Sequence, residues 1–405
     1  MMVKTLPPVR SIIEAIAAAA SAWSDPAFES RQRIRAAVSE RTQYSLPVVD
    51  YAFDRLFRSI TAAAMRDVIA AELGSVEVLD RFVTRAEGIS ARALPVGRVC
   101  VVASRTTIGV AIVPAIFALC AKCEVLVKDR EDHLVAAFFA TLAERLPELA
   151  QFAHARPWRG DDDRVDLAQF ACVVAFGSDA TLNAISQALC VPTRFIAYPS
   201  KASAGYVARE ALSNESDAAA VARGAARDML LYDGEGCLSL RTIFVERGGR
   251  IAPERFCELL AAAIESADER FPATTRIEPS AQRAMARELA NFRTAVADRV
   301  VADPQTSYLV LLDAPAQEPP LFIPRALGVR SVDGPDEAAT YLTNHRISVE
   351  ALAVAPSSKS LLALAARTGA ARIAPFGSLQ APALANLHGG RPRIAEFVRW
   401  LVDET

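Results

Sequence analysis

Short runs of continuous apolar residues alternate along the middle of the chain with longer runs that are apolar at helical spacing. Strands are predicted at 98–104, 124–128 and 171–176, and helices at 108–120, 133–146 and 179–189. Continuous apolar runs are typical of strands that are buried on both faces. Strands that alternate with helices predict a parallel sheet with right-handed crossovers, which is an α/β fold.

Helical and α/β regions flank this central part of the chain. Residues 8–75 read as helices with apolar faces, and packing is the simplest role for them. A second α/β region follows residue 207. Its helices are predicted at 216–231, with Ser216 as N-cap, and at 253–266, 280–297, 335–342, 358–367 and 393–401. Its strands are predicted at 238–246, 307–312, 348–355 and 371–374.

Composition narrows the classes of protein that fit. The 405 residues are 52% hydrophobic, which suits a globular protein of two or three domains, and the net charge of −2 implies no attraction to nucleic acid. The most apolar stretch, 106–120, is too short for a membrane span and contains Pro114. Seven cysteines and no recognisable signal peptide predict a reducing, cytoplasmic location.

Cys237 is the candidate nucleophile of the chain. It lies where a predicted helix passes into a predicted strand, directly after Gly234 and Gly236, which allow a tight turn and the close approach of a ligand. The alternative is that Cys237 is a small buried apolar residue, as most single cysteines are. Cys120 and Cys123 form a CxxC pair without a second pair, so we expect buried thiols there and no metal.

The carboxyl ends of the central strands carry candidate ligand-binding residues, because ligands of open α/β sheets bind at those ends. Lys128 and Arg130 follow the second strand, and Gly177 and Ser178 open the helix after the third. A helix N-terminus beside two cations suits a phosphate and suggests a nucleotide site, although the G-x-G-x-x-G fingerprint is absent. The alternative is a simple turn and helix cap with a charge at a strand end.

Taken in order, these motifs resemble those of the aldehyde dehydrogenase superfamily, over about residues 95–400. Gly234-Glu235-Gly236-Cys237 is similar to the G-Q-x-C segment that holds the superfamily's nucleophile. The segment 125–128 is similar to the strand that ends in its lysine, and 176–178 to its G-S turn. His388 to Gly390, followed by Arg399 and Trp400, resembles the C-terminal signature of the acyl-CoA reductase family, which includes the fatty-acid reductase of bacterial luminescence.

The resemblance implies a fold with two α/β domains, parallel-rich sheets and an N-terminal helical segment. The implied boundaries are 1–90 for the helical segment, 91–210 for the nucleotide-binding domain, 211–380 for the catalytic domain, and 381–405 for a tail that returns to the first domain. It implies that Cys237 is the nucleophile and that Thr106 stands near the oxyanion-binding asparagine. Lys128 would contact the adenosine ribose or its phosphate, and Gly177 with Ser178 the pyrophosphate.

Departures from the superfamily refine the expected reaction. Its E-L-G-G-K segment aligns with 197–201, so Ala197 replaces the glutamate that activates water, and a ribose-binding glutamate falls near Pro320. Without that water-activating base we expect the acyl group to stay on sulfur. The resemblance therefore implies NAD(P)H-dependent reduction of an acyl thioester, a fatty acyl-CoA or acyl carrier protein, to an aldehyde. Lys128 and Arg130 favour NADPH, and NADH is the alternative.

Two other functions remain open on the sequence. One is a reductase of an acyl phosphate, such as γ-glutamyl phosphate. The other is a non-catalytic scaffold that binds an acyl carrier, which the substitutions at Thr106, Ala197 and Pro320 would permit. Because superfamily members pair through sheet edges, we also expect a homo-oligomer.

Overall fold

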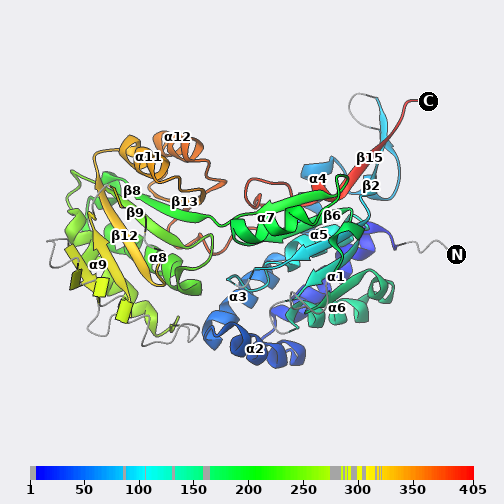
Figure 1. The fold of residues 1–405 in the computed structure, drawn as a ribbon, viewed down its shortest axis with the longest axis horizontal. Helices are drawn as coiled ribbons and strands as arrows, with labels where there is room; N and C mark the ends of the chain where they lie inside the picture. Colours follow the sequence, from blue (N-terminus) through cyan, green and yellow to red (C-terminus); the bar gives the residue numbers. More distant parts are fainter. Residues whose placement is uncertain are drawn as a thin grey trace. The chain divides into compact units, whose positions relative to one another are not determined.

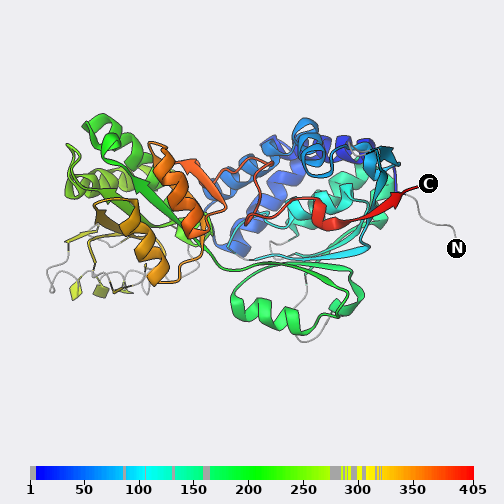
Figure 2. The same cartoon turned by 90° about the horizontal axis from the view of Figure 1, so that it is seen from above.

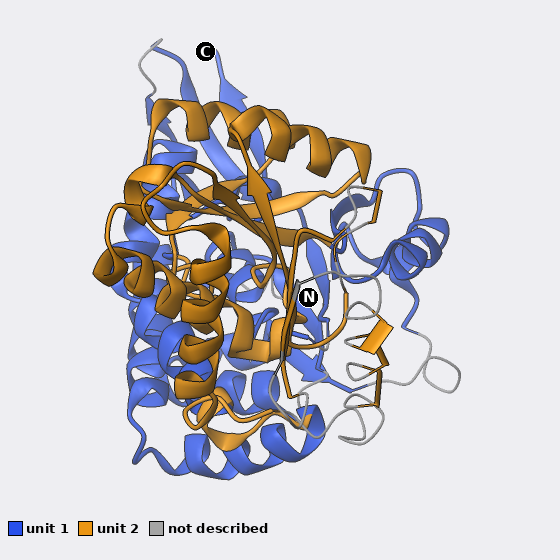
Figure 3. Cartoon of the chain, turned by 90° about the vertical axis from the view of Figure 1, so that its left-hand side faces the viewer, with its two compact units in different colours: residues 1–42, 49–200, 383–405 blue, residues 43–48, 201–382 orange. Residues whose placement is uncertain are grey.

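The structure is a computed structural model that divides the chain into two compact units. Unit 1 consists of residues 1–42, 49–200 and 383–405, and unit 2 of residues 43–48 and 201–382 (Figure 3). The described residues are 6–84, 88–104, 106–129, 133–157, 165–273, 284–285, 288–289, 291–292, 299–302, 307–314, 317–318, 320 and 322–405. Each unit has its own sheet and core and is described by itself; the domain boundaries given above stay a prediction.

Unit 1 is built on a five-stranded parallel sheet in the order β5-β4-β3-β6-β7. Its strands are β3 (Arg98–Val102), β4 (Glu124–Lys128), β5 (Ala153–Arg156), β6 (Cys172–Phe176) and β7 (Arg194–Tyr198). The three predicted strands are confirmed, and they are the three central ones. The two edge strands, β5 and β7, were not predicted because an edge strand carries polar residues that a buried strand excludes.

Helices cover both faces of this sheet. The crossover helices are α5 (Ile112–Cys120), α6 (Leu134–Arg145) and α7 (Asp179–Gln187), all of which were predicted. Helix α7 packs Leu182 against Cys100 and Val173 of the sheet. In Figure 2, α7 (green) lies on one side of the sheet and the blue N-terminal helices lie on the other.

The N-terminal helices of unit 1 are α1 (Val9–Ser24), α2 (Glu29–Thr42), α3 (Leu46–Ser59) and α4 (Ala62–Leu73). The helical region is therefore confirmed, and Trp23 is the centre of its packing. The Trp23 ring lies 5.2 Å from that of Phe57 and 6.3 Å from that of Phe138 on α6. Its indole nitrogen donates to Thr141 Oγ1 at 3.0 Å, so the N-terminal helices are fixed to the crossover helix.

The helix predicted at 393–401 is wrong. Only η6 (Ala395–Phe397) is helical there, and the chain continues as β15 (Val398–Asp403). This strand pairs antiparallel with β2 (Ser90–Pro95), which in turn pairs with β1 (Val83–Thr84). Pairing with β2 decides the conformation of the tail, because tertiary partners override a short local pattern. Glu72 fixes the preceding turn by accepting the backbone N–H groups of residues 393–395 at 2.6–3.1 Å.

Unit 2 is built on a seven-stranded sheet in the order β10-β11-β12-β9-β8-β13-β14, and among these described strands only β10 is antiparallel to its neighbour. Strands β8, β9, β12 and β13 are labelled in Figure 1. The predicted strands β9 (Leu240–Glu246), β11 (Leu309–Leu312), β13 (Val349–Ala355) and β14 (Arg372–Pro375) are confirmed. Three were not predicted: β8 (Ala202–Val207), β10 (Arg299–Ala302) and β12 (Ala326–Val332). Small or charged residues interrupt the apolar character of these three.

Helices of unit 2 follow the predicted order. They are α8 (Glu215–Leu230), α9 (Pro253–Asp268), α11 (Pro335–Asn344) and α12 (Lys359–Thr368). The N-cap of α8 is Asn214 rather than Ser216, because the Asn214 side chain accepts the N–H of Asp217 at 2.9 Å. Most of the helix predicted at 280–297 lies outside the described residues. Over the part of the chain that is described, no helix has the length and apolar character needed to cross a membrane.

Candidate active site

Cys237 lies in the short loop that joins η5 (Leu231–Gly234) to β9. Strand β8 lies between β9 and β13 and is parallel to both, so the loop before β9 is at the amino ends of these three strands. The side chain of Cys237 is partly buried. The residues that enter β8 and β13 at the same edge, around Lys201 and Glu350, are therefore its neighbours.

A strained turn holds the chain just before Cys237. Tyr232 and Asp233 have φ values of 57° and 51°, and Gly234 follows with 76°, so three consecutive residues are left-handed. For the two that are not glycine this costs about 1–3 kcal/mol each and persists only where surrounding contacts fix it. Arg325 provides these surrounding contacts. Its Nε donates to Asp233 Oδ1 at 2.6 Å, and its backbone N–H donates to the Asp233 carbonyl at 3.0 Å.

The surroundings of Cys237 keep its thiol protonated at rest. Burial is the largest effect and, with the negative charge of Glu350, raises the pKa of Cys237 to about 12. The positive charge of Lys201 and the backbone N–H groups of residues 237 and 238 lower this pKa by smaller amounts. Ser203 Oγ donates to the Cys237 carbonyl at 2.9 Å and fixes the loop against β8. At neutral pH the thiol therefore needs a proton acceptor before it can attack.

The two acidic residues nearest to Cys237 in sequence face other partners. Asp233 is paired with Arg325. Glu235 lies close enough to Arg241 for its charge to raise the pKa of that arginine, whose burial lowers it to about 10. Neither is directed to the Cys237 sulfur by these contacts.

A second buried carboxylate, Asp228 of α8, ties another loop to the site. Its oxygens accept the N–H groups of Gly377 at 2.6 Å and Leu379 at 3.1 Å. The Gln380 side chain donates to the Asp228 carbonyl at 3.1 Å and to Ser239 Oγ at 2.9 Å. Ser239 is two residues after Cys237, so these bonds connect the loop to the cysteine segment. Burial raises the pKa of Asp228 to about 7, and the backbone donors oppose that rise.

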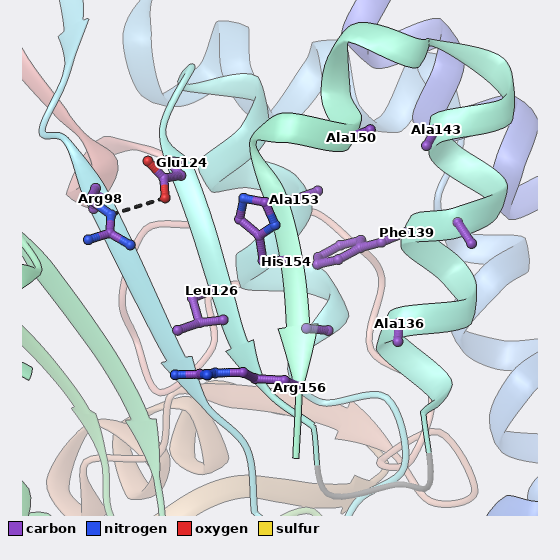
Figure 4. Close-up of a pocket in the computed structure, with 12 residues that line it drawn as sticks. Arg98, Glu124, Leu126, Ala136, Phe139, Ala143, Ala150, Ala153, His154 and Arg156 are labelled. Atoms are coloured by element: carbon purple, nitrogen blue, oxygen red, sulfur yellow. Dashed lines mark hydrogen bonds and ion pairs between the residues drawn. The ribbon is translucent and has the colours of Figure 1, made fainter. Parts of the chain in front are cut away.

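In unit 1, Lys128 ends β4 and Arg156 ends β5, and the two residues are partners in the parallel ladder. Residues in register on neighbouring strands point to the same face of the sheet. On this face a groove of about 640 Å³ runs beside α6, with Leu126, Phe139, His154 and Arg156 in its lining (Figure 4). Arg98 and Glu124 close the other end of the groove with an ion pair of 3.0 Å.

Gly177 and Ser178 lie where β6 passes into α7. The Ser178 hydroxyl caps α7 by accepting the Thr181 N–H at 3.3 Å. A Cβ at Gly177 would lie 3.2 Å from the Thr181 side chain, so glycine lets the turn close tightly on the helix. Beside it, the ring of His388 lies 4.6 Å from that of Tyr198 and 5.4 Å from that of Phe176. The tail thus returns to the carboxyl ends of β6 and β7.

The predicted site residues divide between the units. Thr106, Lys128, Gly177 and Ser178 belong to unit 1, where they follow β3, β4 and β6, and Cys237 belongs to unit 2. Thr106 Oγ1 lies 3.5 Å from Ser104 Oγ. Arg130 lies outside the described residues. Arg156 supplies a cation beside Lys128 that we did not predict, because β5 was not recognised as a strand.

Sequence reasoning also missed several residues around Cys237, namely Ser203, Glu350 and Gln380. Lys201 carried a signal, since it aligns with the lysine of E-L-G-G-K. The sequence indicated Glu350 only in that it is an acidic residue inside a predicted buried strand. The CxxC cysteines, Cys120 and Cys123, are both buried, and burial raises the pKa of Cys123 to about 11. Over the described residues there is no cluster of three or more His, Cys, Asp or Glu side chains that suits a metal ion.

The fold is that of the aldehyde dehydrogenases. Glyceraldehyde-3-phosphate dehydrogenase GapN from Methanocaldococcus jannaschii, solved with NADP, is 12% identical with a TM-score of 0.74, over 99% of this chain and 90% of its own. An NAD-dependent benzaldehyde dehydrogenase from Corynebacterium glutamicum is 15% identical with a TM-score of 0.71, over 99% and 87%. Aldehyde dehydrogenase C from Pseudomonas syringae, solved with NAD⁺ and octanal, is 15% identical with a TM-score of 0.69, over 98% and 84%.

Sequence comparison narrows this fold to one family. The profile described as Acyl-CoA reductase (LuxC) matches residues 5–400, so the chain belongs to that family. It is an oxidoreductase that acts on the aldehyde or oxo group. A search of curated proteins found no match to the chain.

Asp228 generates a prediction about stability and pH. Its folded pKa of about 7 lies above the ordinary value of 3.8, so the folded protein holds a proton that the unfolded chain has released. The stability linked to this proton is present below about pH 4 and is lost as the pH rises to about 7. We expect wild type to lose unfolding free energy relative to Asp228→Asn from pH 5 to 7, by at most about 1.4 kcal/mol per pH unit, and then to level off. Denaturant unfolding of both proteins measures this, and parallel curves would contradict it.

Proposed function

We propose that the protein reduces a fatty acyl thioester, with CoA as the preferred carrier and NADPH as the cofactor, to the aldehyde through an acyl-enzyme on Cys237. The observation that carries this proposal is the placement of a partly buried cysteine, on a turn fixed by Arg325, in a chain of the acyl-CoA reductase family. Acyl carrier protein is the alternative donor.

The first half of the reaction exchanges one thioester for another. The Cys237 sulfur attacks the acyl carbon, the bond from that carbon to the CoA sulfur breaks, and CoA leaves with one proton. The backbone N–H of Cys237 is the candidate donor to the oxyanion, and the role that the resemblance implies for Thr106 stays a prediction. One good donor contributes about 3–4 kcal/mol to such a step.

In the second half, the nicotinamide cofactor supplies a hydride to the acyl carbon when it is bound. The thiohemiacetal on Cys237 then collapses, which releases the aldehyde and returns the sulfur. Ala197 supports this outcome over hydrolysis. It lies in β7 and packs against the apolar core of unit 1, so the superfamily's water-activating carboxylate has no counterpart there.

The residues at the carboxyl ends of β4 and β5 fit a nicotinamide dinucleotide that carries a 2′-phosphate. Lys128 and Arg156 place two positive charges on one face, and Gly177 brings a helix N-terminus to the same edge of the sheet. The bound NADP of GapN and the bound NAD⁺ and octanal of aldehyde dehydrogenase C support a nicotinamide cofactor and an apolar substrate.

The activity itself is tested first. NADPH oxidation, followed by its absorbance, is expected with a series of acyl-CoAs and with acyl carrier protein, together with formation of aldehyde. Cys237→Ala removes the nucleophile and is expected to abolish both signals. Oxidation with an acyl phosphate alone would favour the acyl phosphate reductase. Carrier binding without cofactor oxidation would favour the scaffold.

Cofactor preference is tested at Arg156. Arg156→Gln is expected to raise KM for NADPH about tenfold or more and to leave KM for NADH nearly unchanged, because a charge-assisted contact to phosphate is lost. The matched control is Arg98→Gln, at the opposite end of the groove and paired with Glu124. Tighter binding of NADH than NADPH by wild type would contradict the preference.

We expect the protein to form homo-oligomers through β15. Among the described strands β15 has β2 as its one neighbour, and Trp400, Leu401 and Val402 are exposed along it. A long apolar edge strand invites pairing with another chain. Leu401→Glu is expected to lower the mass measured by light scattering to that of a monomer. Leu362→Glu, at an exposed position on α12, is the control and is expected to keep the wild-type mass.

A further inference from the structure

A buried ion pair lies at the edge of the unit 2 sheet that holds Cys237. Lys201 directly precedes β8, and Glu350 is the second residue of β13. Lys201 Nζ lies 3.1 Å from Glu350 Oε2, and the two side chains are only 18% and 7% exposed. A charged pair in such a place is expensive to desolvate and is retained where its charges have a use or a fixed geometry.

The backbone brings this pair to the cysteine loop. Ser203, two residues after Lys201, donates to the Cys237 carbonyl at 2.9 Å, and its N–H donates to Ser239 at 3.3 Å. Irregularities in both ladders of β8 surround this point, one between Val349 and Leu352 and one between Ser203 and Ala204. Bulges of this kind re-aim side chains beside functional sites.

Charged groups on the neighbouring strands lie around Glu350. Lys201 is its direct partner. Burial lowers the pKa of Arg372 of β14, and the charges of Asp228 and Glu350 raise it by smaller amounts. The Glu350 carboxylate is therefore a candidate proton acceptor that a paired lysine holds in place.

From these contacts we infer that Glu350 accepts the proton of the Cys237 thiol during acyl transfer, while Lys201 stays as the cation that faces the thiolate. The sulfur loses its proton to the Glu350 carboxylate as it attacks the acyl carbon. The bond from that carbon to the leaving sulfur then breaks, and Glu350 returns the proton to the leaving thiolate. Glu350 and Lys201 end the step as they began it, and no oxidant or reductant enters. The inference rests on the proposed thioester chemistry.

The test compares Glu350→Gln with wild type in two measurements. The proposal predicts that the thiol is alkylated at lower pH in the variant but that acylation becomes slower. The first measurement is the rate at which iodoacetamide alkylates Cys237, followed by intact mass at a series of pH values. The midpoint of this pH dependence reports the ionisation of the thiol. Removing the negative charge of Glu350 leaves Lys201 facing the sulfur, so the midpoint is expected to shift down by about 1 pH unit or more. Formation of the acyl-enzyme from acyl-CoA without NADPH, also followed by mass, is expected to slow about 100-fold, because the proton acceptor is gone.

Three further variants separate this role from a structural one. Lys201→Met is expected to raise the alkylation midpoint and slow acylation, and Lys201→Arg to restore both. Glu337→Gln, on the exposed surface of α11, is the control and is expected to match wild type.

The outcomes separate the two proposals. If Glu350→Gln forms the acyl-enzyme at the wild-type rate, the proton transfer is wrong and the proposed function stands. The same conclusion follows if alkylation and acylation both become slower in this variant. A wild-type protein that forms no acyl-enzyme with any thioester would overturn the proposed function, and the proton transfer with it.

Discussion

The position of Cys237 depends on one buried guanidinium. Arg325 is 1% exposed, and it contacts Asp233 in one segment of unit 2 and both Asp268 and the carbonyl of Phe271 in another. A buried charge of this kind is stable only when its partners are all in place, and loss of one partner typically costs about 3–5 kcal/mol. The left-handed residues before Cys237 therefore cannot relax without breaking the same contacts. The strain of the turn is maintained by a network whose other members lie far away in sequence.

The two sheets carry their functional residues at opposite edges. In unit 1, Lys128, Arg156 and Gly177 follow the carboxyl ends of parallel strands, as expected for a nucleotide-binding sheet. In unit 2, Cys237 and Lys201 precede their strands and Glu350 is the second residue of its own, so they gather at the amino edge. Three neighbouring strands, β9, β8 and β13, begin there, and Lys201 and Glu350 form an ion pair at that edge. The rule that places ligands at carboxyl ends thus covers the proposed phosphate-binding residues but not the proposed nucleophile.

The limits of sequence reasoning follow from the same geometry. Strands β3, β4 and β6 are central, and their apolar residues follow one another in the sequence, so the pattern can be recognised locally. Strand β5 is at an edge and carries His154 and Arg156, so it was not recognised as a strand, and Arg156 was not recognised as the cation in register with Lys128. The tail was predicted as a helix because its pairing with β2, some 300 residues earlier in the chain, leaves no local signal. Cys237 was proposed as the nucleophile from the glycines and flanking elements that are local to it, whereas Glu350 is brought to the same edge of the sheet by strand order.

Burial and the negative charge of Glu350 raise the pKa of the Cys237 thiol, so the resting cysteine is a weak nucleophile and is less prone to oxidation. Burial causes most of this shift, and burial is also what excludes water from an acyl-enzyme once it has formed. The same desolvation therefore disfavours both the thiolate and the hydrolysis of its product. An enzyme that must keep an acyl group on sulfur until hydride arrives benefits from the slower hydrolysis, which is the second effect. It has to overcome the first effect, which is the scarcity of thiolate. In the proposed proton transfer, the Glu350 carboxylate, which is paired with Lys201, takes the thiol proton and so overcomes the first effect without a water molecule. In unit 1, the position that aligns with the superfamily's water-activating glutamate is Ala197, and it carries only a methyl group packed in the core.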